Sequence, residues 1–186
     1  MTEIIVLWFI YSFLGWITET LYTSIPKKKF QDRGFLTIPI IPIYGFGALI
    51  VIYLLQPVSD HPLVIFPAAI VATSLLEYVT SNIMERLFNM RWWDYSQRKY
   101  NIKGRVCLRN SLLFGLLSIA LVNYIHPLVK TLIAPLSQRQ LELGSLVIIT
   151  IVSIDTVHAV LFSLRFSKLA VELARIRESL SEREVS

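Results

Sequence analysis

Five long runs of apolar residues constrain the fold of this chain more than any other feature. They cover residues 4–25, 38–55, 62–88, 106–129 and 143–164. A helix needs roughly 20 mostly apolar residues to cross a bilayer. The runs are continuous, whereas the strands of a membrane barrel alternate apolar and polar residues. The sequence therefore predicts an all-α integral membrane protein, a bundle of about five transmembrane helices.

Basic residues gather at alternate ends of these runs. The loop after the first run, the segment between the third and fourth runs with its flanks, and the C-terminal tail hold 16 of the 18 lysines and arginines. Cytoplasmic loops of membrane proteins carry this excess. We therefore predict a multi-pass protein of the cytoplasmic (inner) membrane, with its N-terminus outside and its C-terminus inside. The net charge of +5 follows from topology, so the expected partners are membrane lipids and not nucleic acid.

The chain divides into a five-helix transmembrane domain, residues 1–165, and a tail, residues 166–186. Apolar residues in the tail recur at helical spacing, at Leu169, Leu173, Ile176 and Leu180, with charged residues around them. This pattern predicts a C-terminal amphipathic helix. We expect it to extend the last transmembrane helix into the cytosol or to lie along the membrane surface.

Ionisable residues lie inside the apolar runs, mainly in the halves expected to face the cytoplasm. Glu19, Glu77 and Asp155 fall within spans, and Glu85 lies near a cytoplasmic edge. Each charge at a span centre costs roughly 2.5–3.5 kcal/mol, so such residues usually mark a working site. We infer a polar cavity that opens to the cytoplasm. The alternative is a set of polar contacts that only join helices.

Two groups of residues are candidates for this site. Glu77 and Glu85 share one helix stripe with Ser74 and Ser81, and each is a candidate general base. The candidate binding residues are polar, charged or aromatic side chains near the same boundary: Glu19, Arg33, Trp93, Asp94, Asn101, Arg105, Ser111 and Asp155. Trp93 also fits an interfacial aromatic belt.

Sequence motifs for metals and cofactors are missing from the chain. Asp155 and His158 lie on one helix face and could join Glu77 and Glu85, but no signature such as His-Glu-x-x-His accompanies them. The Gly-x-Gly at residues 45–47 lacks the third glycine and the preceding strand of a dinucleotide site. We expect neither a metal nor a cofactor.

Several short motifs together resemble a known family. They are Arg-Gly-Phe-Leu at 33–36, Pro-Ile-Tyr-Gly-Phe-Gly-Ala at 42–48, Glu-Tyr-Val-Thr-Ser at 77–81, Trp-Trp-Asp-Tyr-Ser at 92–96 and Gly-Arg-Val-Cys-Leu at 104–108. The chain resembles the bacterial membrane family of CmpB-like, type IV ABC-transporter proteins over residues 4–165. The resemblance implies a permease-like role. The chain has no Walker A motif, so any ATPase would be a separate subunit. Five spans are few for a transporter, so a homo-oligomer is a further possibility.

Three functions remain open from the sequence. The first is a membrane transport component, in which Glu77 and Asp155 take part in binding a solute or a proton. The second is a membrane-embedded enzyme acting on a phosphate-bearing lipid, with Arg105 binding phosphate and Glu77 or Glu85 as base. The third is a non-catalytic membrane scaffold or sensor. The sequence does not decide whether the protein is an enzyme.

Overall fold

The computed structural model describes residues 1–58 and 61–185, and almost all of its regular structure is helical. Within that part of the chain, the only strands are β1 and β2, two residues each and paired antiparallel. This confirms the predicted all-α fold class. In chain order the elements are α1 (Thr2–Lys27), α2 (Pro42–Leu55), the 3₁₀ turn η1 (Gln56–Val58), α3 (Pro62–Phe88), β1 (Asn101–Ile102), β2 (Val106–Cys107), α4 (Leu108–Ala120), the π-helix η2 (Leu121–Ile125), α5 (His126–Ile133) and α6 (Gln138–Val185).

Four helical stretches among the described residues are long and apolar enough to cross a membrane. They are Thr2–Lys27, Pro62–Phe88, Leu108–Ile133 and Gln138–Leu169. The third stretch combines α4, η2 and α5. These stretches correspond to four of the five predicted runs, and they define a membrane protein.

The remaining predicted span, residues 38–55, forms a shorter helix. Residues 38–41 precede it without regular structure, and α2 begins at Pro42. Proline has no N–H and disfavours helix in the residue before it, so Pro42 suits the first turn of α2 and Ile41 before it stays extended. With η1, this apolar helix covers Pro42–Val58. The predicted orientation depends on a crossing here, so it stays a prediction.

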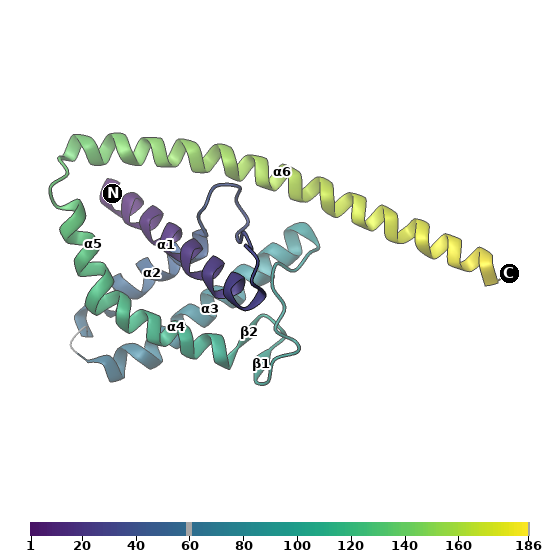
Figure 1. The fold of residues 1–186 in the computed structure, drawn as a ribbon, viewed down its shortest axis with the longest axis horizontal. Helices are drawn as coiled ribbons and strands as arrows, with labels where there is room; N and C mark the ends of the chain where they lie inside the picture. Colours follow the sequence, from purple (N-terminus) through teal and green to yellow (C-terminus); the bar gives the residue numbers. More distant parts are fainter. Residues whose placement is uncertain (59–60, 186) are drawn as a thin grey trace.

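The fourth run is interrupted by the π-helix η2, which ends two residues before Pro127. Because Pro127 cannot donate a backbone hydrogen bond, the carbonyl four residues earlier loses its α-helical partner. A local π turn is one way to accommodate such a defect. Figure 1 shows the chain changing direction between α4 and α5 at this point.

The buried core joins α1, α2 and α5. Leu7 and Tyr11 of α1 contact Ile52 of α2 and Val129 of α5, and each of these side chains is at most 5% exposed. A second cluster joins α2 to α3, with the fully buried Ile65 at its centre. These two clusters fix α2 between α1 and α3.

Gly45 brings α2 close to α1. A Cβ atom at Gly45 would lie 2.2 Å from Ser12 Oγ and 2.5 Å from the Trp8 carbonyl oxygen. Only a residue without a side chain fits this contact. The close approach places Glu19 of α1 beside Tyr44 of α2.

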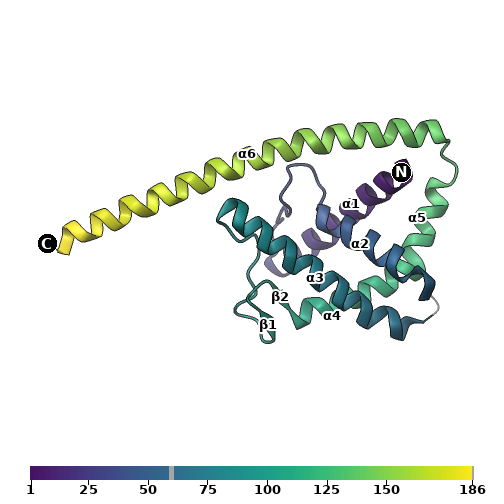
Figure 2. The same cartoon turned by 180° about the vertical axis from the view of Figure 1, so that it is seen from behind.

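Helix α6 runs along one side of the other helices and continues far beyond them to the C-terminus (Figures 1 and 2). Leu161 and Phe162 are among its many exposed apolar side chains, as expected for a face that meets lipid. The predicted tail helix is present as the continuation of α6 to Val185. Ser186, the last residue of the predicted tail, lies outside the described residues.

Candidate functional site

A cavity of about 420 Å³ lies among α1, α2, α3 and α4, and the loops that follow α1 and α3 complete its wall. Most of its lining is apolar or aromatic. Polar side chains reach it from each of these elements: Thr18, Glu19, Asp32, Arg33, Tyr44, Thr73, Glu77, Thr80, Tyr95, Asn110 and Ser118. A mainly apolar pocket of this size with a few convergent polar groups is typical of a small-molecule site.

Glu19 is held between two partners in the cavity wall. The Tyr44 hydroxyl donates a hydrogen bond of 2.7 Å to Glu19 Oε2. On the other carboxylate oxygen, Arg33 Nε lies 4.0 Å from Glu19 Oε1, and the Arg33 side chain is 44% exposed. The ion pair is therefore long and open to solvent, and it stabilises Glu19 only weakly.

Glu77 is the most buried carboxylate of the cavity, at 6% exposure. The Tyr95 hydroxyl donates a hydrogen bond of 3.1 Å to Glu77 Oε1. The other oxygen, Oε2, is buried and has no hydrogen-bond partner among the described residues. A buried acceptor without a partner is costly, and functional sites are one place where such groups occur.

Tyr95 lies in the loop between α3 and β1 and reaches back into the cavity. Burial raises the pKa of its hydroxyl well above the ordinary value, and the neighbouring Glu77 carboxyl raises it further. The phenol therefore stays protonated at physiological pH and acts as a donor to Glu77.

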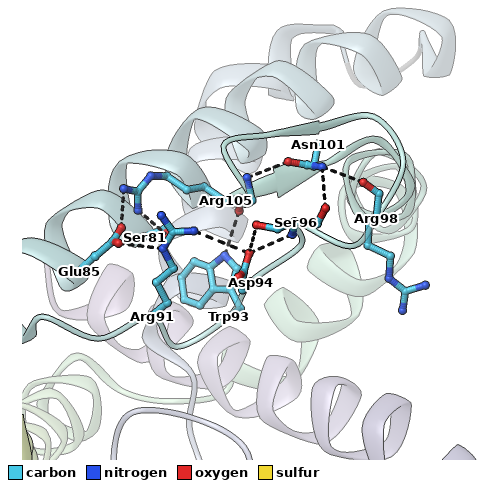
Figure 3. A network of polar contacts seen from close by, with 10 residues as sticks. Ser81, Glu85, Arg91, Trp93, Asp94, Ser96, Arg98, Asn101 and Arg105 are labelled. Carbon is cyan, nitrogen blue, oxygen red and sulfur yellow. Dashed lines mark hydrogen bonds and ion pairs between the residues drawn. The ribbon is translucent and has the colours of Figure 1, made fainter. Parts of the chain in front are cut away.

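A second group of polar residues ties the loop after α3 to the helix itself (Figure 3). Glu85, near the end of α3, accepts a hydrogen bond of 2.8 Å from Arg91 Nε. Its other oxygen lies 2.5 Å from Arg105 Nη2. Arg105 also donates to Ser81 Oγ at 3.2 Å and lies over the Tyr78 ring. The Arg105 guanidinium is thus engaged by α3 and does not line the cavity.

Asp94 and Asn101 shape the same loop. Asp94 Oδ1 accepts hydrogen bonds from the backbone N–H and the hydroxyl of Ser96, at 2.9 and 2.5 Å. Asn101 accepts from the Gly104 N–H at 2.8 Å and donates to the Arg98 carbonyl at 2.8 Å. These are local turn contacts of the kind that Asp and Asn commonly make.

Gly104 fits into this loop because it lacks a side chain. Its φ is 69°, and a Cβ atom there would lie 2.4 Å from both Asp94 Oδ1 and Ser96 Oγ. The turn lets Trp93 Nε1 donate to the Arg105 carbonyl at 3.0 Å, while the Trp93 side chain lines the cavity. The network therefore positions part of the cavity wall.

Ser111 and Asp155 lie outside the cavity. Ser111 is buried between α3 and α4, where it shares a hydrogen bond of 2.8 Å with Ser74. Asp155 on α6 accepts hydrogen bonds from the backbone N–H groups of Thr37 and Ile38, at 2.8 and 3.2 Å. It joins α6 to the segment before α2.

The structure thus separates the predicted residues into two sets. Glu19, Arg33, Glu77 and Trp93 line one cavity, whereas Glu85, Asp94, Asn101, Arg105, Ser111 and Asp155 make contacts between helices and loops. Tyr44, Tyr95 and Asn110 also line the cavity and are not among the site residues predicted from the sequence. Both tyrosines lie within motifs that carry the family resemblance, at residues 42–48 and 92–96. Those motifs are the signal in the sequence that could have identified them as site residues.

The described residues include no group of three or more His, Cys, Asp or Glu side chains arranged to hold a metal ion. The cavity instead offers carboxylates, phenols, an amide and one guanidinium. Such groups can bind a polar or charged part of a ligand while the apolar wall contacts the rest.

Helices that are long and apolar enough to cross a membrane, with a cavity among them, define an α-helical membrane protein. The chain belongs to the family described as "Putative ABC-transporter type IV", whose family model matches residues 6–160. The match covers the helices and loops that form the cavity and ends within α6. Searches of curated proteins and of solved structures each found no match.

Proposed function

We propose that this protein is the membrane component of a transport system and that its cavity binds the transported ligand. The observation that carries the proposal is the cavity itself, with Glu19, Glu77 and Arg33 in a largely apolar wall. Membership of the transporter-type family supports it. Charged groups at membrane depth are costly and are expected where a ligand needs them.

The lipid-enzyme alternative has less support. It relies on Arg105 as a phosphate-binding residue, but that guanidinium already contacts Glu85, Ser81 and Tyr78. Glu85, the second candidate base, is paired with Arg91 and Arg105. These contacts give both residues a role in holding the loop.

The proposed setting is the cytoplasmic membrane, with the N-terminus outside and the C-terminus inside. The loops after α1 and α3, which border the cavity, are rich in lysine and arginine. The cavity would then open toward the cytoplasm. An impermeant thiol reagent should label a Gln97→Cys variant in inverted vesicles and not in right-side-out vesicles. Labelling with the opposite preference would reverse the orientation.

Native mass spectrometry of the protein released from its own membrane tests the proposed function. We expect the protein to carry a bound small molecule. In part of the protein molecules we also expect a bound ATPase subunit or a second copy of the chain. Glu77→Gln keeps the shape of the side chain but removes its charge, so the small molecule should be lost. The matched control is Glu142→Gln, because Glu142 is exposed at the start of α6 and its side chain accepts a local hydrogen bond from Gln138.

Two results would contradict this function. One is a wild-type protein that carries neither a ligand nor a partner subunit, which would favour a scaffold. The other is equal ligand retention in Glu77→Gln and in the wild type, which would remove the cavity carboxylate from ligand binding.

A further inference from the structure

The charge of the cavity wall indicates the class of ligand. Four of the lining residues are acidic or basic: Glu19, Asp32, Arg33 and Glu77. Carboxylates therefore outnumber cations three to one in the lining, and the cation, Arg33, is the half-exposed member of a 4.0 Å pair. An anion would meet repulsion from three carboxylates, whereas a cation would be attracted.

Glu77 is the buried carboxylate of the cavity. Its Oε2 is buried without a hydrogen-bond partner among the described residues, and the side chain is 6% exposed. Tyr95 satisfies only Oε1. A carboxylate removed from water is stabilised by a positive charge or a proton, so this position favours a cationic group.

Aromatic side chains line the same cavity as the carboxylates. The cavity is lined by Phe35, Tyr44, Trp92, Trp93, Tyr95 and Phe114. Phe35 and Trp92 pack edge to face, with ring centroids 5.4 Å apart, and so do Tyr44 and Phe114, at 5.9 Å. Faces of aromatic rings attract cations, and cages of such rings with a carboxylate are a common way to recognise quaternary ammonium groups.

The remaining wall is apolar and the space is moderate in size. Leu14, Val51, Leu76 and Leu117 contribute to the lining of a cavity of about 420 Å³. Such a wall adds affinity for a hydrocarbon body. A small hydrated metal cation would gain nothing from these side chains.

We propose that the cavity binds an organic cation with an apolar body, whose charged group lies at Glu77 and Glu19. This inference rests on the proposed function, since it takes the cavity to be the ligand site. It goes further by naming the chemical class of the ligand.

Cysteine labelling tests the proposal in the full chain reconstituted in nanodiscs. Thr80 lines the cavity one helical turn from Glu77, so Thr80→Cys places a thiol beside the carboxylate. The reagents are the cationic 2-(trimethylammonium)ethyl methanethiosulfonate and the anionic 2-sulfonatoethyl methanethiosulfonate. The native Cys107 is 1% exposed, and the parent protein measures its background reaction. Each rate is divided by the rate of the same reagent with free 2-mercaptoethanol.

We expect the cationic reagent to be favoured by about tenfold after this correction, as field focusing in a charged cleft allows. Adding Glu77→Gln should reduce the preference several-fold, whereas adding Glu142→Gln should leave it unchanged. Benzyltrimethylammonium should protect the thiol from both reagents, and benzenesulfonate should not. Thr18→Cys on α1 provides a second position in the same lining if Thr80→Cys does not fold.

The outcomes separate this inference from the proposed function. No labelling above the parent background at either position would mean that the cavity is closed to ligands, and both proposals would fail. Equal corrected rates would leave an accessible cavity without cation selectivity, which would overturn this inference alone. Faster reaction of the anionic reagent would also overturn it, in favour of a phosphate-bearing lipid or solute.

Discussion

Arg105 Nη2 lies 2.5 Å from Glu85 Oε2, and this contact fastens the start of β2 and α4 to the end of α3. The two side chains are 12% and 29% exposed, so water screens the pair only in part. Arg105 adds a hydrogen bond to Ser81 and a contact with the Tyr78 ring. The pair thereby holds the loop that presents Trp93 and Tyr95 to the cavity.

We predict that Glu85 and Arg105 stabilise the fold as a unit. In a double-mutant cycle with Glu85→Gln and Arg105→Gln, the double variant should lose less free energy of unfolding than the sum of the two single losses, because both single variants break the same contact. Arg105→Lys should also destabilise the protein, because lysine lacks the fork that reaches Glu85 and Ser81 together. Unfolding by sodium dodecyl sulfate, followed by circular dichroism, measures each variant.

The control for this cycle is Arg109→Gln. Arg109 is exposed in the first turn of α4, four residues after Arg105. Its loss should change the free energy of unfolding by less than about 0.5 kcal/mol, as for other surface positions. A coupling between Glu85 and Arg105 near zero, or an equal effect of Arg109→Gln, would contradict the structural role of the pair.

The helices could be predicted from the sequence because the length and the hydropathy of a segment are local properties of the chain. Four predicted runs appear as helices long enough to span, at nearly the predicted positions. The run that differs, residues 38–55, contains Pro39 and Pro42, whose effect on the start of α2 depends on where the chain must turn. There the N–H of Ile41 bonds to the Ser12 carbonyl of α1, a contact that no local pattern contains.

The residues that line the cavity could be predicted from the sequence only in part. Helical spacing gives the depth of Glu19, Glu77 and Asp155 along their helices, but not the direction that each helix face takes in the bundle. Glu19 and Glu77 face the same cavity, whereas Asp155 faces the backbone of residues 37 and 38. Tyr95 reaches Glu77 because its loop folds back, and that path depends on tertiary contacts.

Protonation of Asp94 should destabilise the loop between α3 and β1, and it should do so only at acid pH. Hydrogen bonds from the hydroxyl and then the backbone N–H of Ser96 hold the pKa of the Asp94 carboxyl below its ordinary value of 3.8, and Arg91 lowers it further. A carboxyl with a lowered pKa in the folded state stabilises that state at higher pH, and this contribution is lost as pH falls through the folded-state value. We therefore expect the contribution of Asp94 to the stability of the loop to be constant from neutral pH down to about pH 5 and to be lost as pH falls through 3.8 and below.

Hydrogen exchange of the Ser96 and Gly104 amides, corrected for the intrinsic rate at each pH, measures this effect. Ser96 N–H bonds to Asp94, and Gly104 N–H bonds to Asn101 in the same turn. In Asp94→Asn, protection should be lower at neutral pH, and its fall below pH 3.8 should be smaller than in the wild type. Loss of protection in the wild type between pH 7 and 5 would show that another group controls the loop.

Gly45 and Gly144 form a matched pair for testing the contact between α1 and α2. In Gly45→Ala, the added methyl group would lie 2.2 Å from Ser12 Oγ and 2.5 Å from the Trp8 carbonyl oxygen, so the helices must separate. Overpacking of this kind should cost about 1–3 kcal/mol in the free energy of unfolding. Gly144 on α6 has nothing within 4 Å of the added atom, so Gly144→Ala should stabilise the protein by about 0.5–1 kcal/mol through helix propensity. The double variant Ser12→Ala/Gly45→Ala should recover only part of the lost free energy of unfolding, because the Trp8 carbonyl remains in place. Full recovery would show that the Ser12 hydroxyl alone sets the distance between the helices.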